Sequence, residues 1–382
     1  MNDAITPAPP VPLNPLLNEN KLKLGLFSIN GTGAAYTNHP DRFDPSWPNI
    51  RNLAQLADRL GLEVLLSFAR WKPFGGDGNA SGLTLDPVSW AGAVAAVTDH
   101  IAIVSTMHVP VNHPLFVAKA GATIDRISNG RWGLNVVCGW YQAEIEMFGA
   151  ALKAHEDRYG VADEWIEVVE RLWTEKASFD YQGKYFDLKG LYSDPHPLQR
   201  RPVIMNAGGS PRGQDYAAQH ADCAFIVAFD SRPEAIRKQV EAYRTTAREK
   251  YGRELQIWTY AHVVQRDTVA EAQAYVDAYS GDEYGNHAAA DSFIENNIAT
   301  AKTAPPEVIL PLKKAMMAGA GGIPLLGTPD GIAGRLAEVS DAGVDGVLVN
   351  WLDYQSGLTE FGQTVMPLLE QRGLRKPFHA LA

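Results

Sequence analysis

The sequence predicts an α/β fold, a (β/α)8 TIM barrel with insertions. Short apolar runs alternate with longer amphipathic segments along almost the whole 382-residue chain, as is typical of parallel βαβ units. Most of the runs are continuously apolar, which indicates strands that are buried on both faces. Eight strand–helix repeats favour a closed barrel over a doubly wound open sheet. The eight expected strands are Lys23–Ile29, Val64–Ala69, Ile101–Met107, Trp132–Cys138, Pro202–Ala207, Ala224–Ala228, Trp258–Gln265 and Gly346–Trp351.

Helical patterns lie between these runs. Pro114–Ile127 has apolar residues at helical spacing and is followed by Asn129-Gly130, a helix stop. No GxGxxG sequence joins a strand to a helix, so the open dinucleotide-binding sheet lacks its best signal. The other expected helices are Pro48–Leu60, Val88–Thr98, Asp157–Glu175, Arg212–His220, Pro233–Lys250, Val269–Tyr279, Asp330–Ala342 and Leu358–Arg372.

Three segments depart from the simple alternation. Residues 1–20 are rich in proline and predict an extended arm that lies on the body or on a partner subunit. The remainder, 21–382, is expected to be a single barrel domain. Residues 281–326 predict an insertion with helices at Ser292–Thr303 and Pro306–Ala318, and such insertions often form lids over active sites. Residues 178–188 have a Gln-Gly turn between aromatic-rich arms, which predicts a β-hairpin.

Composition excludes several classes of function. A net charge of −10 disfavours nucleic-acid binding, which needs a basic surface. No apolar stretch is long enough to span a bilayer, and the first residues lack the pattern of a secretory signal. The two cysteines, Cys138 and Cys223, have no CxxC partners, so neither a zinc site nor a disulfide framework is expected. These observations predict a cytoplasmic protein without nucleic-acid or membrane partners.

The active site of a parallel barrel lies at the carboxyl ends of its strands. Asn135 interrupts the apolar fourth strand, and a buried amide costs free energy unless it is hydrogen-bonded. It is therefore either a core residue satisfied by backbone or part of a ligand site. Thr106 and His108 end the third strand. No carboxylate lies at metal-ligand spacing beside His108 or His113, so no metal site is expected. Trp140 follows the fourth strand.

Two further strand ends carry residues suited to a phosphate. Arg158 beside Tyr159 can bind phosphate through a charge-assisted hydrogen bond and a hydroxyl. Gly209 allows close approach of the backbone, and Ser210 is the expected N-cap of a helix, whose N-terminus attracts anions. Arg70, in the loop after the second strand, either holds an anionic ligand or a flavin carbonyl, or is a solvated loop charge. No nucleophile motif or metal motif is present, so a phosphorylated cofactor such as FMN is expected to perform the chemistry.

Several longer motifs resemble the bacterial luciferase-like family of flavin-dependent monooxygenases, most strongly its pyrimidine and dimethylsulfone monooxygenase branches. The resemblance covers roughly residues 23–374, except much of the insertion. Its motifs, in order, are ATIDRISNGRWGLNVVCGWYQAEIEMFG, HEDRYGVADEWIEVVERLW, FDYQGKYFDLKGLYSDPHPLQ, NAGGSPRGQDYAAQHAD, LLGTPDGIAGRL and FGQTVMPLL.

This resemblance implies a two-component enzyme. Reduced FMN would come from a separate NAD(P)H:flavin reductase, and one oxygen atom of O2 would pass to a small organic substrate such as a heterocycle, amide or sulfone. The pyrimidine branch favours a flavin N5 oxygen adduct over the C4a peroxide of luciferase. The family also implies a homo-oligomer, either a dimer or a tetramer.

The resemblance also implies roles for individual residues. The phosphate would be held by Arg158, Tyr159 and Ser210. The full set of flavin contacts would be Ala69, Arg70, Asn135, Glu144, Arg158, Tyr159, Gly209 and Ser210. The pocket beside the flavin would be formed by Leu66, Thr106, Asn135 and Trp140, with His108 bonding to the substrate. The loop HVPVNHPLF and the insertion differ from the relatives, so the identity of the substrate does not carry over.

Two alternatives remain open at this point. One is a deazaflavin-dependent oxidoreductase on the same barrel. The other is a non-catalytic flavin-binding protein, against which the intact set of Asn135, Trp140 and Arg158-Tyr159 argues.

Overall fold

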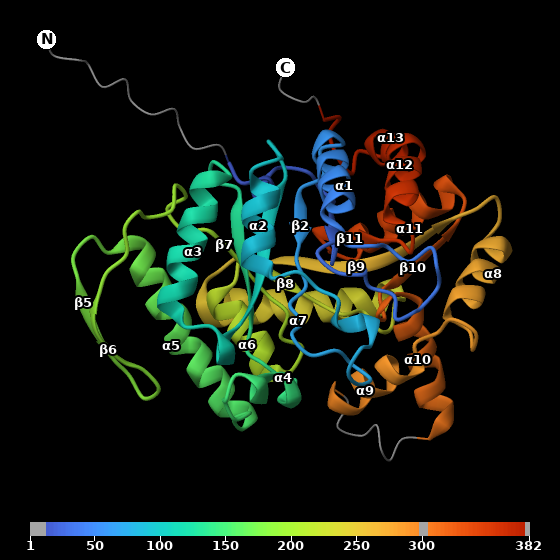
Figure 1. The fold of residues 1–382 in the computed structure, drawn as a ribbon. Coiled ribbons are helices and arrows are strands. Elements are labelled where there is room, and N and C mark those ends of the chain that lie inside the picture. Colours follow the sequence, from blue (N-terminus) through green and yellow to red (C-terminus); the bar gives the residue numbers. More distant parts are fainter. Residues whose placement is uncertain (1–12, 298–304, 379–382) are drawn as a thin grey trace, which may run out of the picture.

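The fold is a closed parallel barrel of eight strands surrounded by helices (Figure 1). The computed structural model describes residues 13–297 and 305–378. Around the ring the strand order is β1-β2-β3-β4-β7-β8-β9-β11, and β11 pairs with β1 to close it. The predicted fold class and all eight predicted strands are confirmed. The ring strands are β1 (Lys23–Phe27), β2 (Val64–Leu66), β3 (Ala102–His108), β4 (Trp132–Val137), β7 (Val203–Asn206), β8 (Cys223–Phe225), β9 (Gln256–Gln265) and β11 (Gly346–Asn350).

Alternation along each strand decides which side chains enter the barrel. The inner core includes Val104 of β3, whereas its neighbour Ile103 packs outward against the helices. Side chains point to opposite faces with a period of two. Thr106 therefore faces the interior near the end of β3. By the same rule, Leu134 and Val136 pack outward on β4, and Asn135 between them faces inward.

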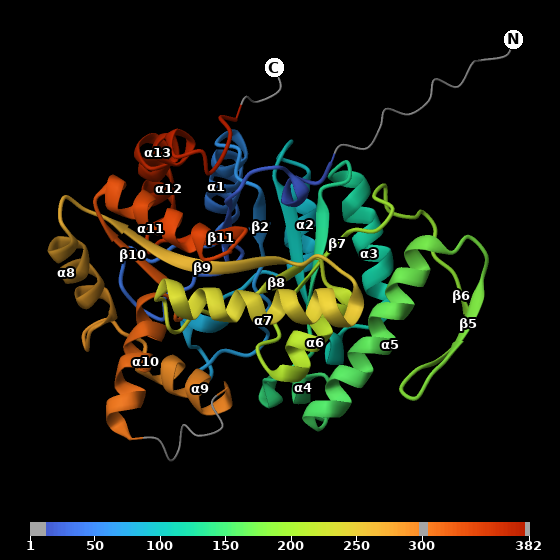
Figure 2. The ribbon, with the colours of Figure 1, turned by 180° about the vertical axis from the view of Figure 1, so that it is seen from behind.

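The helices cover the outside of the barrel. Figure 2 shows α7 lying beside α6 across the back of the molecule. Several helices start with proline behind a side-chain cap, such as Asp86, Ser210 and Thr328. The covering helices are α1 (Trp47–Arg59), α2 (Pro87–Ala95), α3 (Pro114–Ile127), α5 (His155–Thr174), α6 (Pro211–His220), α7 (Pro233–Tyr251), α11 (Pro329–Asp341), α12 (Tyr354–Thr364) and α13 (Met366–Gln371). Short 3-10 turns occur at η1 (Pro15–Leu17), η2 (Ala80–Gly82) and η3 (Val109–Val111).

One helix prediction was wrong in detail, and one short helix was missed. The single helix expected at Leu358–Arg372 is the pair α12 and α13, which meet at Val365 just before Pro367. Proline cannot continue the hydrogen-bond ladder of a helix, so a new helix starts there. The short helix α4 (Gln142–Met147) was not expected from the sequence.

The expected insertion contains helices and an additional strand. After α8 (Val269–Ser280) come α9 (His287–Asn297), α10 (Pro306–Gly319) and β10 (Ile323–Gly327). The part of the expected helix Ser292–Thr303 beyond Asn297 lies outside the described residues. The strand β10 was not predicted. It pairs with the last five residues of β9, beyond the residues that pair with β8, and so covers an otherwise open strand edge.

The hairpin prediction is confirmed. Strands β5 (Phe179–Gln182) and β6 (Asp187–Leu191) pair antiparallel and lie outside α5 in Figure 1. Of the expected arm, residues 1–12 lie outside the described part of the chain. In the described part of the arm, Leu16 is fully buried and packs with the inner core of the barrel. Within the described residues, no helix is both long and apolar enough to cross a membrane.

A buried ion pair joins the two ends of the described chain. Arg375 Nη1 lies 3.3 Å from Glu63 Oε2, and both side chains are buried. Glu63 also accepts hydrogen bonds from Asn18, Asn20 and the Leu24 backbone N–H. The carboxylate therefore anchors the N-terminal segment, β1 and the C-terminal segment at once.

Replacing Arg375 by alanine should lower the free energy of unfolding by about 3–5 kcal/mol, because it leaves a buried carboxylate without its counter-charge. Urea unfolding of the purified variant measures this loss. The matched control is Lys376→Ala, which removes an exposed ion pair with Glu19 and should change stability by less than about 1 kcal/mol. Equal losses in the two variants would contradict the assigned role of the buried pair.

Candidate active site

Five of the predicted site residues line one open cleft at the carboxyl ends of β4, β7 and β8. Its volume is about 720 Å³. One end is lined by Arg158, Tyr159, Gly209 and Ser210, and the other by Trp140 and by Phe293 from the insertion. Residues more than 150 positions apart in the chain thus meet on one surface. The roles of these residues toward a ligand stay predictions.

Asn135 and Thr106 are paired across β3 and β4. The two residues are in register, and Asn135 Nδ2 donates to Thr106 Oγ1 at 3.0 Å. The Thr106 hydroxyl in turn donates to the Ser67 carbonyl at 2.5 Å. Its single proton is used there, so the hydroxyl oxygen must accept from the amide. This chain of bonds fixes which way the Asn135 amide points.

The carbonyl oxygen of Asn135 is left without a partner. The side chain is buried, and Oδ1 has no hydrogen bond within the described residues. A buried acceptor that lacks a hydrogen bond destabilises the folded protein by about 1–3 kcal/mol. The interpretation of Asn135 as a core amide satisfied by backbone is therefore wrong, because in the described part of the chain its side chain bonds only to the side chain of Thr106. An N–H group of a ligand would satisfy the open oxygen.

The phosphate candidates lie together. Ser210 Oγ accepts from Gly213 N at 3.1 Å as the cap of α6, and His155 Nε2 lies 3.1 Å from the same hydroxyl. Tyr159 is buried in the cleft wall, and burial raises the pKa of its hydroxyl, which stays protonated at neutral pH. Gly209 faces open space, with no atom within 4 Å of where a Cβ would be.

Arg158 has free hydrogen-bonding capacity at this end of the cleft. Its Nη1 donates to the Gly139 carbonyl at 2.5 Å, whereas its buried Nε has no partner within the described residues. His155 belongs to this group and was not predicted. It lies three residues before Arg158, one helical turn away, which is the only signal in the sequence that could have indicated it.

Glu144 is engaged mainly with the protein itself. Oε2 lies 3.1 Å from His108 Nδ1, and Oε1 accepts from the backbone N–H groups of Trp71 and Lys72. The carboxylate thus holds the loop after β2 against β3. Its direct contact with FMN stays a prediction. His108 was considered alone in the sequence, and its carboxylate partner comes from a position 36 residues later.

The charge of Glu144 is favoured by its surroundings. Burial alone would raise its pKa, but the His108 hydrogen bond, the Arg70 charge and the Trp71 N–H together hold the pKa below its ordinary value. The carboxylate is therefore ionised at neutral pH. Within the described residues, no group of three or more potential ligands is arranged for a metal ion.

Glu144→Gln should destabilise the protein by about 3–5 kcal/mol at pH 7, because it leaves Arg70 without its counter-charge. A lowered folded-state pKa contributes stability above the unfolded value near 4.3, and this contribution is lost as the pH falls through the folded pKa. The difference in the free energy of unfolding between wild type and Glu144→Gln should therefore become smaller below about pH 4.3. Urea unfolding from pH 3.5 to 7 checks this, with the exposed Glu146→Gln on the same helix as control. A stability difference that grows as the pH falls would contradict the assigned role of the Glu144 carboxylate.

Arg70 is buried in an aromatic cage. Its side chain is 2% exposed and its guanidinium carbon lies 3.9 Å from the ring centre of Phe74. Phe68, Trp140 and Tyr141 complete the cage at 4.8–5.4 Å. Burial lowers the pKa of Arg70, although the Glu144 charge opposes this. The interpretation of Arg70 as a solvated loop charge is wrong, since the aromatic side chains that surround it come from the loops after β2 and β4.

The remaining predicted residues lie near this cage. Trp140 stacks on Phe74 with ring centres 5.6 Å apart and meets Phe293 of α9 at 5.7 Å. Ala69 is buried, and Leu66 packs in the inner core of the barrel. The insertion therefore helps to close the apolar end of the cleft. The roles of Leu66 and Ala69 toward a ligand stay predictions.

This barrel has a cleft at its strand ends with Arg158 and Ser210 in its lining, and β4 carries a buried amide oxygen that has no partner among the described residues. These features are typical of cofactor-dependent barrel enzymes. The family model for luciferase-like monooxygenases matches residues 22–346. The chain belongs to this family and is a flavin-dependent monooxygenase, as the resemblance of its motifs predicted.

Proteins similar over nearly the whole chain support this assignment. The pyrimidine monooxygenase RutA of a Bradyrhizobium species, strain BTAi1, is 29% identical over 364 residues, which cover 93% of this chain and 99% of the relative. The FMNH2-dependent dimethylsulfone monooxygenase of Pseudomonas putida is 30% identical over 334 residues, which cover 84% and 87%.

Solved structures share the fold. A riboflavin lyase, crystallised with modified FMN and riboflavin, superposes with a TM-score of 0.82 at 24% identity and 94% coverage of both chains. The DmoA protein of Hyphomicrobium sulfonivorans gives a TM-score of 0.81 at 23% identity, over 95% of this chain and 91% of that one.

Proposed function

We propose that the protein is the oxygenase component of a two-component, FMNH2-dependent system. It would transfer one oxygen atom from O2 to a small organic substrate, a heterocycle, amide or sulfone, with reduced FMN supplied by a separate NAD(P)H:flavin reductase. The observation that supports this best is the cleft, which brings Arg158, Tyr159 and Ser210 together at the end of β4, the strand that carries the open oxygen of Asn135. The names of the relatives point to the same chemistry.

The phosphate end of the cleft is suited to FMN. Arg158, Tyr159 and Ser210 offer a charged donor and two hydroxyls, and Gly209 leaves space for close approach. The N-terminus of α6 adds a positive partial charge, which favours a bound anion. Arg158 Nε is buried and unpaired, and a phosphate oxygen would satisfy it.

The other end is suited to the flavin ring. Asn135 Oδ1 would accept from a ring N–H, with Thr106 holding the amide in place. Ala69 and Arg70 would border the ring through their main-chain groups, and Leu66 would lie beneath it. Reduced FMN, when bound, would supply the two electrons for the reaction with O2, and Asn135 would help to hold it.

The residues around the ring would exclude water and position the substrate. Trp140, Phe74 and Phe293 form a continuous aromatic wall, and a dry site protects a reactive centre from hydrolysis. His108 is held by Glu144 through Nδ1, which leaves its Nε2 available to a substrate. Because members of this family commonly assemble, a homodimer or homotetramer is part of the proposal.

Cofactor titration and turnover test the proposal. Oxidised FMN and the deazaflavin cofactor are titrated separately against the protein, and O2 uptake is followed with FMN, NADH and a flavin reductase in the presence of heterocycles, amides and sulfones. We expect FMN to bind more tightly and O2 uptake to depend on one of the substrates. Preference for the deazaflavin cofactor would overturn the assignment of FMN. Binding of FMN without turnover on any compound would favour a non-catalytic flavin-binding protein.

A further inference from the structure

The loop between β7 and α6 is held at Gly208 by two side chains. Asn206 Oδ1 accepts from Gly208 N at 2.9 Å, and Asn206 Nδ2 donates to the Val136 carbonyl of β4 at 2.8 Å. The Tyr243 hydroxyl of α7 donates to the Gly208 carbonyl, also at 2.8 Å. Both backbone hydrogen-bonding groups of Gly208 are therefore fixed, one from the barrel and one from the outer layer of helices.

Tyr243 reaches this loop from the core and not from the cleft. Gly208 and Gly209 line the cleft, and Tyr243 does not. The Tyr243 side chain is 1% exposed and packs among the buried residues between the barrel and its helices. Its helix α7 lies against α6 (Figure 2). Burial raises the pKa of the phenol, so the hydroxyl keeps its proton and stays a hydrogen-bond donor at neutral pH.

The Tyr243 hydrogen bond also sets the direction of the Gly209 N–H. The Gly208 carbonyl and the Gly209 N–H belong to the same peptide unit, which is trans. In a planar trans peptide the C=O and N–H bonds point in opposite directions. Because the carbonyl is turned toward the core, the N–H is turned away from it, toward the cleft. This N–H forms no hydrogen bond within the described residues.

Two consecutive glycines need such a bond to keep one orientation of the peptide. Without a Cβ, Gly208 and Gly209 can adopt many backbone conformations. Close packing requires glycine here, because a Cβ at Gly208 would lie 2.7 Å from Gly213 Cα, and one at Gly213 would lie 2.6 Å from the Tyr159 hydroxyl. The loop thus packs against α6 and Tyr159 at the expense of backbone rigidity. The bond from Tyr243 restores that rigidity at one peptide.

We propose that Tyr243 is a positioning residue for the FMN phosphate, because it directs the Gly209 N–H toward the bound anion. This inference rests on the proposed function, which places the phosphate beside Arg158 and Ser210. A hydrogen bond from an N–H group to a phosphate oxygen is charge-assisted. A donor that is already oriented loses little conformational freedom when the ligand binds. Tyr243 acts only through the Gly208–Gly209 peptide, since it lies outside the cleft.

Tyr243→Phe tests the proposal by removing a single oxygen atom. Fluorescence titrations measure the affinities of oxidised FMN and of riboflavin, and the ratio of the two isolates the contribution of the phosphate. We expect the Kd for FMN to rise about three- to tenfold, as for the loss of one hydrogen bond. The Kd for riboflavin should stay within about twofold of wild type. The ³¹P NMR signal of bound FMN should also shift, because the phosphate loses an oriented donor.

Tyr279→Phe is the matched control. Tyr279 of α8 is also buried, and its hydroxyl donates to a backbone carbonyl, that of Ala318, at 2.7 Å. Urea unfolding should show a similar loss of stability in the two variants. Tyr279→Phe should keep the wild-type affinities for FMN and for riboflavin.

Three results would count against the proposal. Unchanged FMN affinity in Tyr243→Phe, or an equal loss of FMN and riboflavin affinity, would overturn the positioning role of Tyr243 and leave the proposed function intact. Wild-type protein that binds riboflavin as tightly as FMN would contradict the phosphate end of the proposed function, and the role of Tyr243 with it.

Discussion

Asn135→Ala is expected to reduce substrate-dependent turnover by at least about a hundredfold while the chain still folds. The substitution removes both the open Oδ1 and the donor to Thr106. Loss of one preorganised hydrogen-bond partner of a reacting group commonly lowers kcat by about 10²–10³. The Thr106 hydroxyl keeps its bond to Ser67, so stability should change by only about 1 kcal/mol. Steady-state rates with FMN, NADH and a reductase, together with urea unfolding, measure the two effects.

A second buried asparagine provides the matched control. Asn350, at the end of β11, donates to the Ala261 carbonyl at 2.8 Å, so its amide supports the backbone. Asn350→Ala should lower stability by about 1–2 kcal/mol and leave turnover within a few-fold of wild type. If Asn350→Ala lost turnover and Asn135→Ala kept it, the assignment of Asn135 to the flavin site would be wrong.

Arg158→Met is expected to raise the Kd for FMN by about 10–100-fold. The variant keeps most of the aliphatic packing but removes a charged donor from the phosphate end of the cleft, and such a donor contributes about 1.5–3 kcal/mol. Fluorescence titration of FMN measures the change. Riboflavin, which lacks the phosphate, should bind wild type and variant with similar affinity, because the lost interaction is with the phosphate alone.

Arg171→Met controls for the loss of an arginine on the same helix. Arg171 pairs with Glu175 near the far end of α5, away from the cleft. The FMN affinity of Arg171→Met should equal that of wild type. Two results would show that Arg158 acts on the fold and not on the phosphate. One is an equal loss of FMN affinity in Arg158→Met and Arg171→Met, and the other is a loss of riboflavin affinity in Arg158→Met as large as its loss of FMN affinity.

The barrel could be predicted because its signals are local. Each ring strand is a short apolar run, and most of the covering helices have a side-chain cap or a proline start, so these signals do not depend on distant contacts. The strand β10 could not be predicted in this way. Its partner edge exists only because β9 extends beyond its neighbour β8, and that difference in length appears only in the folded molecule. The six residues of α4 are too few to produce a helical period.

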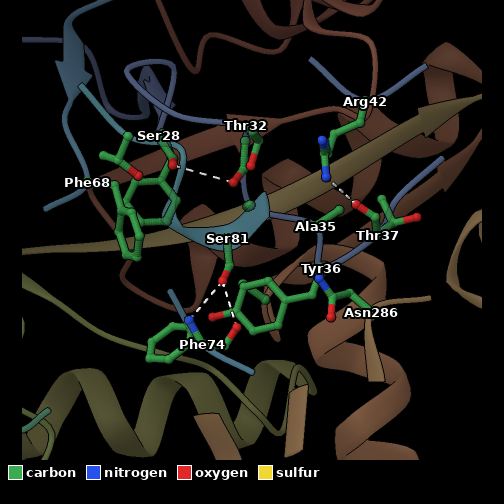
Figure 3. Close-up of a pocket in the computed structure, with 15 residues that line it drawn as sticks. Ser28, Thr32, Ala35, Tyr36, Thr37, Arg42, Phe68, Phe74, Ser81 and Asn286 are labelled. Carbon is green, nitrogen blue, oxygen red and sulfur yellow. Dashed lines mark hydrogen bonds between the residues drawn. The ribbon is translucent and has the colours of Figure 1, made fainter. Parts of the chain in front are cut away.

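The site could be predicted only in part. Thr106, Asn135 and the phosphate residues follow from the rule that strand ends meet at one face of a barrel. That rule does not predict the pairing of Glu144 with His108 or the burial of Arg70. Each of these features depends on segments that follow or end two different strands. The small cavity beside the loop after β1 is lined by Tyr36, Phe74 and Asn286, which come from three distant segments (Figure 3). No local pattern marks any of them as a neighbour of the others.

Isotope incorporation tests the central claim most directly. The protein is incubated with FMN, NADH, a flavin reductase and the compound that supports O2 uptake, under ¹⁸O2 in ordinary water, and the product is examined by mass spectrometry. The account predicts a product that contains one ¹⁸O atom per molecule and loses this label when FMN or the reductase is omitted. A product labelled from water, or formed without added flavin, would contradict it.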